Sequence, residues 1–182
     1  MKIRNGFVSN SSSSNFIVTF PHVPKSAREV RKLMFWNKKY FPIAYGKGAF
    51  STMTIAKTVF GDIERQEAVT KPSQISEHML KGHVNTFIEQ CEDDLYRDMP
   101  RREKFESVEE YDKARAEWDK REKNFWDIYR KEVHDIAKEY LKSNSDGVTY
   151  LFGYSDNDGR YFSTLEHGGI FDRLPNITVS CH

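Results

Sequence analysis

The chain has 182 residues, of which 38% are hydrophobic, 14% aromatic and 30% charged, and its formal net charge is +1. A length in this range favours one domain, which we expect to span residues 1–182, and the aromatic content excludes a disordered chain. Because the net charge is so small, no long-range field attracts polyanions, and we do not expect nucleic acid as a partner unless a local basic patch exists.

The cysteine usage and the lack of a visible targeting signal indicate which cellular compartment to expect. Cys91 and Cys181 lie far apart and form no disulfide framework, which fits a reducing environment. Lys2 and Arg4 are not followed by the apolar stretch of a secretion signal, and no apolar run approaches ~18 residues. We therefore expect a cytoplasmic protein (host cytoplasm if the chain is viral) with no membrane segment; its oligomeric state stays unknown.

The N-terminal part begins with a polar run and a strand. Residues 9–15 are Ser and Asn only, and residues 16–20 are the β-branched and aromatic residues typical of a strand. Ser26, with Glu29 three residues later, predicts the start of a short helix that ends near Trp36.

Two further segments precede the long helices. Residues 37–50 mix aromatics with Pro and Gly, which indicates a packed loop or short extended pieces. Residues 51–69 have apolar residues at helical spacing but many β-branched residues, and we favour a helix there.

The middle of the chain predicts two long amphipathic helices. One apolar stripe runs from Ile75 to Leu95, and a second follows the capping box of Ser107 and Glu110 and continues to about Asn144. At 1.5 Å per residue the second helix is roughly 50 Å long. The short charged linker between them predicts an antiparallel helical hairpin over residues 73–143, packed on the body or projecting from it, with a possible break in the polar stretch 119–124.

The C-terminal part returns to strand patterns. Residues 148–154 and 161–165 flank a loop containing Asp-Gly, which predicts a β-hairpin, and residues 177–180 alternate as a last strand. The order of elements predicts an α+β fold, with a small, mainly antiparallel sheet from both chain ends and a long antiparallel helical hairpin.

Two polar clusters at the chain ends are candidates for a ligand site. The Ser/Asn run can form an anion-binding nest for a phosphate, or can be a flexible lead-in to the strand. The Glu166–His167 turn can form a metal or acid–base cluster, or can be an ordinary loop. We predict no metal and no cofactor, we assign no catalytic residue, and we list the predicted ligand-binding residues as Ser11, Ser12, Ser13, Ser14, Glu166, His167 and Asp172.

A partner-binding surface is predicted on the long helices. Between residues 101 and 123 the basic and acidic side chains balance, so this stretch is a solvated face and not a nucleic-acid patch. The predicted partner-binding residues are Trp118, Arg121 and Trp126, which combine aromatic surface with a cation.

Both chain ends carry a resemblance. The opening Gly6-Phe7-Val8-Ser9-Asn10, followed by serines up to Ser14 and then Asn15-Phe16, resembles uncharacterised small bacteriophage and bacterial proteins that begin G-F-V-S-N-S-S-S-S-S-F. Residues 166–177 are similar to a tail that recurs in such proteins. The resemblance implies a phage or bacterial origin, and implies that the two ends form one unit with the helical middle as an insertion.

Two functions follow as hypotheses. The first is a phage-type accessory protein that binds a host or viral macromolecule, for host takeover or counter-defence, with a host or viral protein as the partner. The alternative is a small phosphate-ligand or nucleotide-binding protein or enzyme, with its site formed by the Ser-rich run and the Glu166–His167 turn. Whether the chain is an enzyme stays open.

Overall fold

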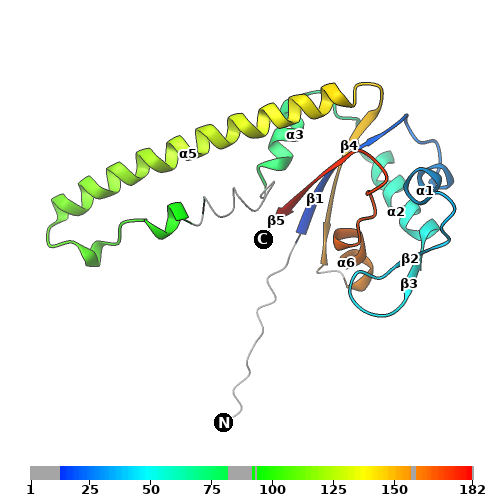
Figure 1. Cartoon of the computed structure of the whole chain (residues 1–182), viewed down its shortest axis with the longest axis horizontal. Coiled ribbons are helices and arrows are strands. Elements are labelled where there is room, and N and C mark those ends of the chain that lie inside the picture. The colour runs from blue at the N-terminus through cyan, green and yellow to red at the C-terminus, as the bar shows by residue number, and fades with distance from the viewer. Residues whose placement is uncertain (1–12, 82–91, 93, 157–158, 182) are drawn as a thin grey trace, which may run out of the picture.

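A three-stranded antiparallel sheet joins the two ends of the chain (Figure 1). The computed structural model describes residues 13–81, 92, 94–156 and 159–181. Strand β1 (Ser13–Phe20) lies in the centre, between β4 (Val148–Ser155) and β5 (Asn176–Cys181). Both pairings are antiparallel. The predicted α+β class and the sheet built from both chain ends are confirmed.

One face of the sheet is covered by helices α1 (Ala27–Phe35), α2 (Thr52–Glu64) and α6 (Arg160–His167). The core on this side is rich in aromatic side chains, because β1 and β4 direct alternate residues toward these helices. Its central members are Phe16, Phe20, Phe152, Tyr154 and Phe171. Two short strands, β2 (Tyr40–Pro42) and β3 (Ala49–Ser51), pair beside this layer.

The opposite face is covered by α3 (Pro72–Met79) and the C-terminal half of α5 (Val108–Ser143). This second core combines aliphatic residues of the helices with Ile17 of β1 and Val179 of β5. The Tyr140 hydroxyl fixes α5 to the sheet, since it accepts a hydrogen bond from Thr19 Oγ1 (3.0 Å) and lies 2.8 Å from the Pro175 carbonyl oxygen, to which it donates.

The N-terminal half of α5 extends beyond the sheet (Figure 1). Together with the segment that precedes it, this half of the helix forms an arm, which we define as residues 94–128. The segment before α5 packs along it, because the Trp118 indole donates to the Leu95 carbonyl oxygen (2.9 Å) and Arg121 pairs with Asp98. The 36-residue helix continues through residues 119–124 without a break. No helix within the described ranges is both long and apolar enough to cross a bilayer.

The predicted helical hairpin over residues 73–143 is not clearly formed. Its second helix is α5, capped by Ser107 and Glu110 as expected. Its first helix is described as α3 at one end and as a helical turn at residues 94–97 at the other, and residues 82–91 and 93 lie outside the described residues. The long stripe from Ile75 to Leu95 therefore corresponds to one short described helix and one turn.

The predicted β-hairpin at the C-terminus is wrong in its second half. Residues 161–165 belong to helix α6, with Leu165 fully buried in the aromatic core. Their aromatic and β-branched content favours a strand, but Val69 and Gln66 pair with the outer edge of β4, where a hairpin strand would lie. Tyr161 and Leu165 are four residues apart, so a helix directs both toward the aromatic core. The other strands and helices predicted up to residue 69, and the last strand, are confirmed as β1, α1, α2 and β5.

His78 lies at the junction between α3 and the sheet. Its ring lies 3.2 Å from the Phe152 carbonyl oxygen, and burial, with a smaller contribution from Lys81, lowers its pKa from the ordinary 6.5, while the hydrogen bond to Phe152 acts in the opposite direction. The unfolded chain therefore binds a proton at a higher pH than the folded chain does. This contribution to stability is complete above pH 6.5 and is lost as the pH falls toward the lowered value in the folded state.

We expect the free energy of unfolding, measured with urea from about pH 8 to about pH 5, to fall less steeply in His78→Gln than in the unchanged protein. Glutamine can still donate to the Phe152 carbonyl but takes up no proton. An identical pH profile for the two proteins would show that His78 does not titrate differently on folding.

Candidate functional site

Three elements meet at one corner of the sheet: the start of β1, the end of β4 and the C-terminal end of α6. The register places Ser13 opposite Ser155 and Ser14 opposite Tyr154, so the serine run enters the sheet beside the residues that follow β4. Glu166 and His167 close α6 next to them. The structure brings together one residue of each predicted polar cluster, Ser14 and Glu166.

The carboxylate of Glu166 is the centre of this corner. The residue is 4% exposed, although carboxylates are seldom buried without compensation. Its Oε1 atom lies 3.5 Å from the Ser14 hydroxyl and 3.4 Å from His167 Nε2. Its Oε2 atom is buried and has no hydrogen-bond partner among the described residues. One oxygen is thus held in place from two sides, and the other is left available.

Two further potential cation ligands lie near the Glu166 carboxylate. One ligand atom each of Asp156, Glu166 and His167 lies within 4.8 Å of the other two. Two ligand atoms that each lie ~2.0–2.2 Å from a tetrahedral ion are about 3.3–3.6 Å apart. The side chains therefore have to close by up to about 1.5 Å to hold an ion. Two carboxylates and one imidazole suit a divalent cation such as Mn²⁺ or Zn²⁺.

Two glycines give the chain its path after α6. A side chain at Gly168 would collide with the Thr164 carbonyl oxygen and with the ring of Phe41, so strand β2 packs directly on this turn. Gly169 has a φ of 67°, in the left-handed region, and any Cβ there would meet the carboxylate of Asp172. The turn can therefore only be built with glycine, and it holds the end of α6 against β2.

The loop between β2 and β3 forms one wall of the corner. The Ala44 amide donates to Thr164 Oγ1 (3.3 Å), and the ring of Tyr45 packs edge-on against His167 with centroids 5.2 Å apart. Tyr45 is 65% exposed, so its ring covers His167 and still presents a surface to solvent. Neither Tyr45 nor Asp156 was predicted. Asp156 belongs to an Asp-rich turn, a pattern that a simple loop explains equally well.

The remaining predicted ligand residues are placed as follows. Ser11 and Ser12 lie outside the described residues. Ser13 begins β1, one residue from Ser14 but on the other face of the strand. Asp172 lies in the turn under Gly169 and is not part of the Asp156–Glu166–His167 group.

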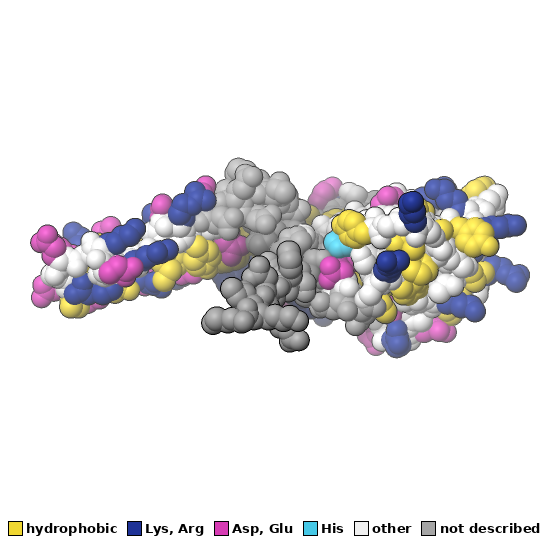
Figure 2. Space-filling view, turned by 90° about the horizontal axis from the view of Figure 1, so that it is seen from below, with side chains coloured by type: hydrophobic (Ala, Val, Ile, Leu, Met, Phe, Trp, Pro, Cys, Tyr) yellow, Lys and Arg dark blue, Asp and Glu magenta, His cyan; other side chains and the backbone are white. Residues whose placement is uncertain are grey.

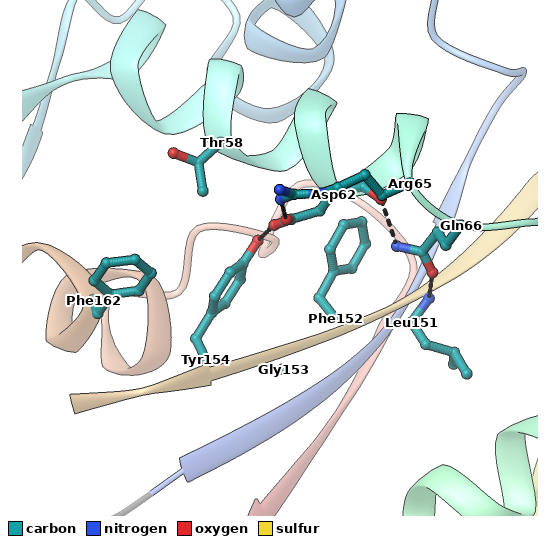
Figure 3. A pocket seen from close by; sticks show the side chains of 9 residues that line it. All are labelled: Thr58, Asp62, Arg65, Gln66, Leu151, Phe152, Gly153, Tyr154 and Phe162. Atoms are coloured by element: carbon teal, nitrogen blue, oxygen red, sulfur yellow. Dashed lines mark hydrogen bonds and ion pairs between the residues drawn. The ribbon is translucent and has the colours of Figure 1, made fainter. Parts of the chain in front are cut away.

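A hollow of about 430 Å³ beside β4 is a second candidate site. Figure 3 shows that several of the side chains that line it pair with one another. The Tyr154 hydroxyl donates to Asp62 (2.9 Å), Asp62 pairs with Arg65, and Gln66 accepts from the Leu151 amide. Burial and the Asp62 charge raise the pKa of Tyr154 well above 10.0, so the phenol stays a hydrogen-bond donor. Because these polar groups already have partners, the Glu166 corner is the stronger candidate site.

The predicted partner-binding residues differ in their exposure. Trp118 is 3% exposed and fills the contact between α5 and Leu95, so its ring is not presented to a partner. Arg121 is exposed and pairs with Asp98, and Trp126 is half-buried against Phe125 and Tyr129. The indole of Trp118 therefore stabilises the arm itself.

Because Glu166 Oε2 has no hydrogen-bond partner among the described residues, we expect the Glu166 carboxylate to lower the stability of the protein when no cation is bound. A buried charge without full compensation costs several kcal/mol. We expect Glu166→Gln to stabilise the metal-free protein by about 1–2 kcal/mol, equivalent to a rise of roughly 2–8 °C in Tm. Thermal unfolding in EDTA measures this, with exposed Glu64→Gln as the control that should change Tm little. A lower Tm for Glu166→Gln would mean that the carboxylate is fully compensated in the folded protein.

Comparison with known proteins adds no family to this description. No protein-family model, no curated protein and no solved structure among those compared matches this chain. The resemblance of the two chain ends to phage and bacterial proteins therefore stays a prediction. The chemistry of the corner has to be derived from its own side chains.

Proposed function

We propose that this chain binds a divalent cation at the Glu166 corner and, through the cation, a phosphate-containing ligand. The observation that carries the proposal is the buried Glu166 carboxylate, whose Oε2 atom has no hydrogen-bond partner among the described residues and which lies within reach of ligand atoms of Asp156 and His167. A buried anion retained without a full set of hydrogen bonds is typical of a functional site. A cation removes the cost of burying it.

The charge of the corner determines how a phosphate can bind there. Asp156 and Glu166 repel an anion, so the serine hydroxyls alone do not make a favourable phosphate site. A divalent cation reverses the sign of the local field, and three protein ligands leave coordination positions for ligand oxygens. The Ser14 hydroxyl donates to Glu166 Oε1 and so fixes the orientation of the carboxylate that would bind the cation.

The proposal predicts that Mn²⁺ or Zn²⁺ stabilises the protein against heat. At a cation concentration 100 times the dissociation constant, binding adds about 2.7 kcal/mol, which raises Tm by roughly 5–11 °C. Differential scanning fluorimetry after EDTA treatment measures this shift. Glu166→Gln and Asp156→Asn should lose it, and Glu64→Gln, an exposed carboxylate on α2, should keep it.

The second step of the proposal is tested with the same measurement. We expect ATP or GTP to raise Tm further only when the cation is present, because the cation supplies the positive charge that holds the phosphates. Nucleotide shifts of equal size in EDTA and in Glu166→Gln would show that the phosphates bind elsewhere. No shift with any divalent cation would end the proposal.

Binding of a host or viral protein through the arm is a second candidate function, and a groove supports it. An open hollow of about 420 Å³ lies between the segment before α5 and α5 itself, lined by Leu95, Phe125, Ile128 and Arg121 among others. Ile128 is 52% exposed although it belongs to this apolar surface. The resemblance to phage proteins suggests a protein of the host or the virus as the occupant.

We expect Ile128→Asp to weaken capture of a specific partner at least about tenfold, because central apolar residues carry most of the binding energy of an interface. Affinity purification from lysate with quantitative mass spectrometry measures this. Ile136→Asp is the matched control, since Ile136 is also exposed on α5 but lies outside the arm. The same partners in the same amounts for both variants and the unchanged protein would exclude this role of the groove.

A further inference from the structure

The small net charge of the chain conceals a strongly uneven distribution. Residues 25–57, which form α1, β2, β3 and the first part of α2, carry eight Lys and Arg residues and one acidic residue, Glu29. The rest of the chain from Asp62 onward carries an excess of acidic residues. We call residues 25–57 the basic layer. It covers one side of the sheet, away from the arm, where Figure 2 shows Lys and Arg side chains projecting beside hydrophobic ones.

Most cations of the basic layer are free to bind an external anion. Glu29 is already engaged by His22 (2.6 Å) and by the Lys25 amide. Arg31 is used inside the protein, where it donates to Thr52 Oγ1 and to the Lys38 carbonyl oxygen. Within the described part of the chain, no ion pair involves the exposed residues Arg28, Lys32, Lys38, Lys39, Lys47 and Lys57.

Three exposed aromatic residues belong to the same stretch of chain as these cations. Trp36 is 56% exposed, Tyr40 67% and Tyr45 65%. An open hollow of about 450 Å³ beside α1 is lined by Arg28, Lys32 and Trp36, with the already paired Glu29 at its side. Cations interleaved with exposed rings are the arrangement on which the bases of a single strand stack while its phosphates are neutralised.

The backbone of Trp36 is a second, independent indication. Its φ of 55° makes it the single non-glycine residue with positive φ in the described chain. A residue with a bulky side chain in that conformation costs on the order of 1–3 kcal/mol, and such strain concentrates at functional positions. Glycine would avoid the strain, yet the position carries an exposed indole, which Arg173 approaches from the C-terminal turn (5.9 Å from its guanidinium carbon to the ring centroid).

We infer that the basic layer binds single-stranded nucleic acid, with Trp36, Tyr40 and Tyr45 as stacking platforms. Single strands are favoured over duplexes because their bases offer open faces to the three rings. The small net charge of the whole chain argued against a nucleic-acid partner. The local excess of cations in the basic layer nevertheless attracts the phosphates of a strand.

The basic layer also continues into the Glu166 corner. Tyr45 packs on His167, the Ala44 amide donates to Thr164 of α6, and Lys47 follows in the same loop. A strand stacked on Tyr45 therefore brings a backbone phosphate beside Asp156, Glu166 and His167. This last step rests on the proposed cation site and makes its phosphate ligand a nucleic-acid strand; the binding of the strand to the basic layer does not depend on it.

The experiment measures fluorescence anisotropy of labelled oligo-dT and oligo-U of about 16 nucleotides, near the upper site size of single-strand-binding folds, in EDTA and across a range of salt concentrations. We expect log K to fall with log salt with a slope near −3, as for about four phosphates neutralised on a single strand. The triple variant Lys38→Ala, Lys39→Ala, Lys47→Ala should weaken binding at least about tenfold and make the slope shallower by about 2. The matched control is Lys113→Ala, Lys120→Ala, Lys123→Ala on the arm, which should stay within about twofold.

Substitution of the rings separates stacking from structure. Trp36→Gly should lose about tenfold in affinity with an unchanged salt slope, while its Tm stays equal or rises because glycine tolerates the backbone conformation. Glu166→Gln should keep full binding in EDTA, which separates this inference from the cation site. Absence of binding at low salt, equal loss in the arm control, preference for duplex, or binding only to vesicles containing phosphatidylserine would each overturn it.

Discussion

The central position of β1 is the constraint on which the rest of the molecule depends. This strand is hydrogen-bonded on both edges and buried on both faces, and Ile17, Val18 and Phe20 are inaccessible to solvent. Alternate side chains therefore anchor two different layers: Phe16, Val18 and Phe20 hold the aromatic core under α1, α2 and α6, and Ile17 holds the aliphatic core under α3 and α5. A shift of one residue in register would exchange the two sets. The same register fixes Ser14 under Glu166, so the geometry of the candidate site is set by the pairing of the sheet.

Local signals predicted most elements, because their chemistry is contained in neighbouring residues. Ser26 and Ser107 cap α1 and α5 as the spacing to Glu29 and Glu110 indicates, and β1 and β5 follow their β-branched content. Helix α6 could not be predicted in this way. Its residues are typical of a strand, but Val69 and Gln66, which are remote in sequence, pair with the edge of β4 where a hairpin strand would lie, and a helix buries Leu165 instead. The first long helix was predicted to continue beyond Met79, where α3 ends, because a stripe at helical spacing does not show where a helix stops.

The candidate site was partly predictable for a similar reason. Ser14, Glu166 and His167 are polar residues in unusual local surroundings, and the idea that both chain ends share one sheet brings them together. Asp156 gave no signal, since an aspartate in an Asp-Asn-Asp-Gly turn needs no further explanation. Tyr45 joins the corner through a loop that is remote in sequence, and the uneven charge of residues 25–57 is hidden when charges are summed over the whole chain.

The attachment of α5 at Tyr140 has a mechanical consequence. One hydroxyl contacts Thr19 of β1 and the carbonyl oxygen of Pro175 just before β5, close to the point where the helix meets the sheet. The C-terminal half of the helix packs on the sheet, and the helix runs on past the edge of the sheet without a break, so it is a stiff beam clamped over about half of its length. A sideways force at the free tip acts as a torque on the clamped half. Tyr140 passes part of that torque to β1, the strand that carries Ser14 at its opposite end.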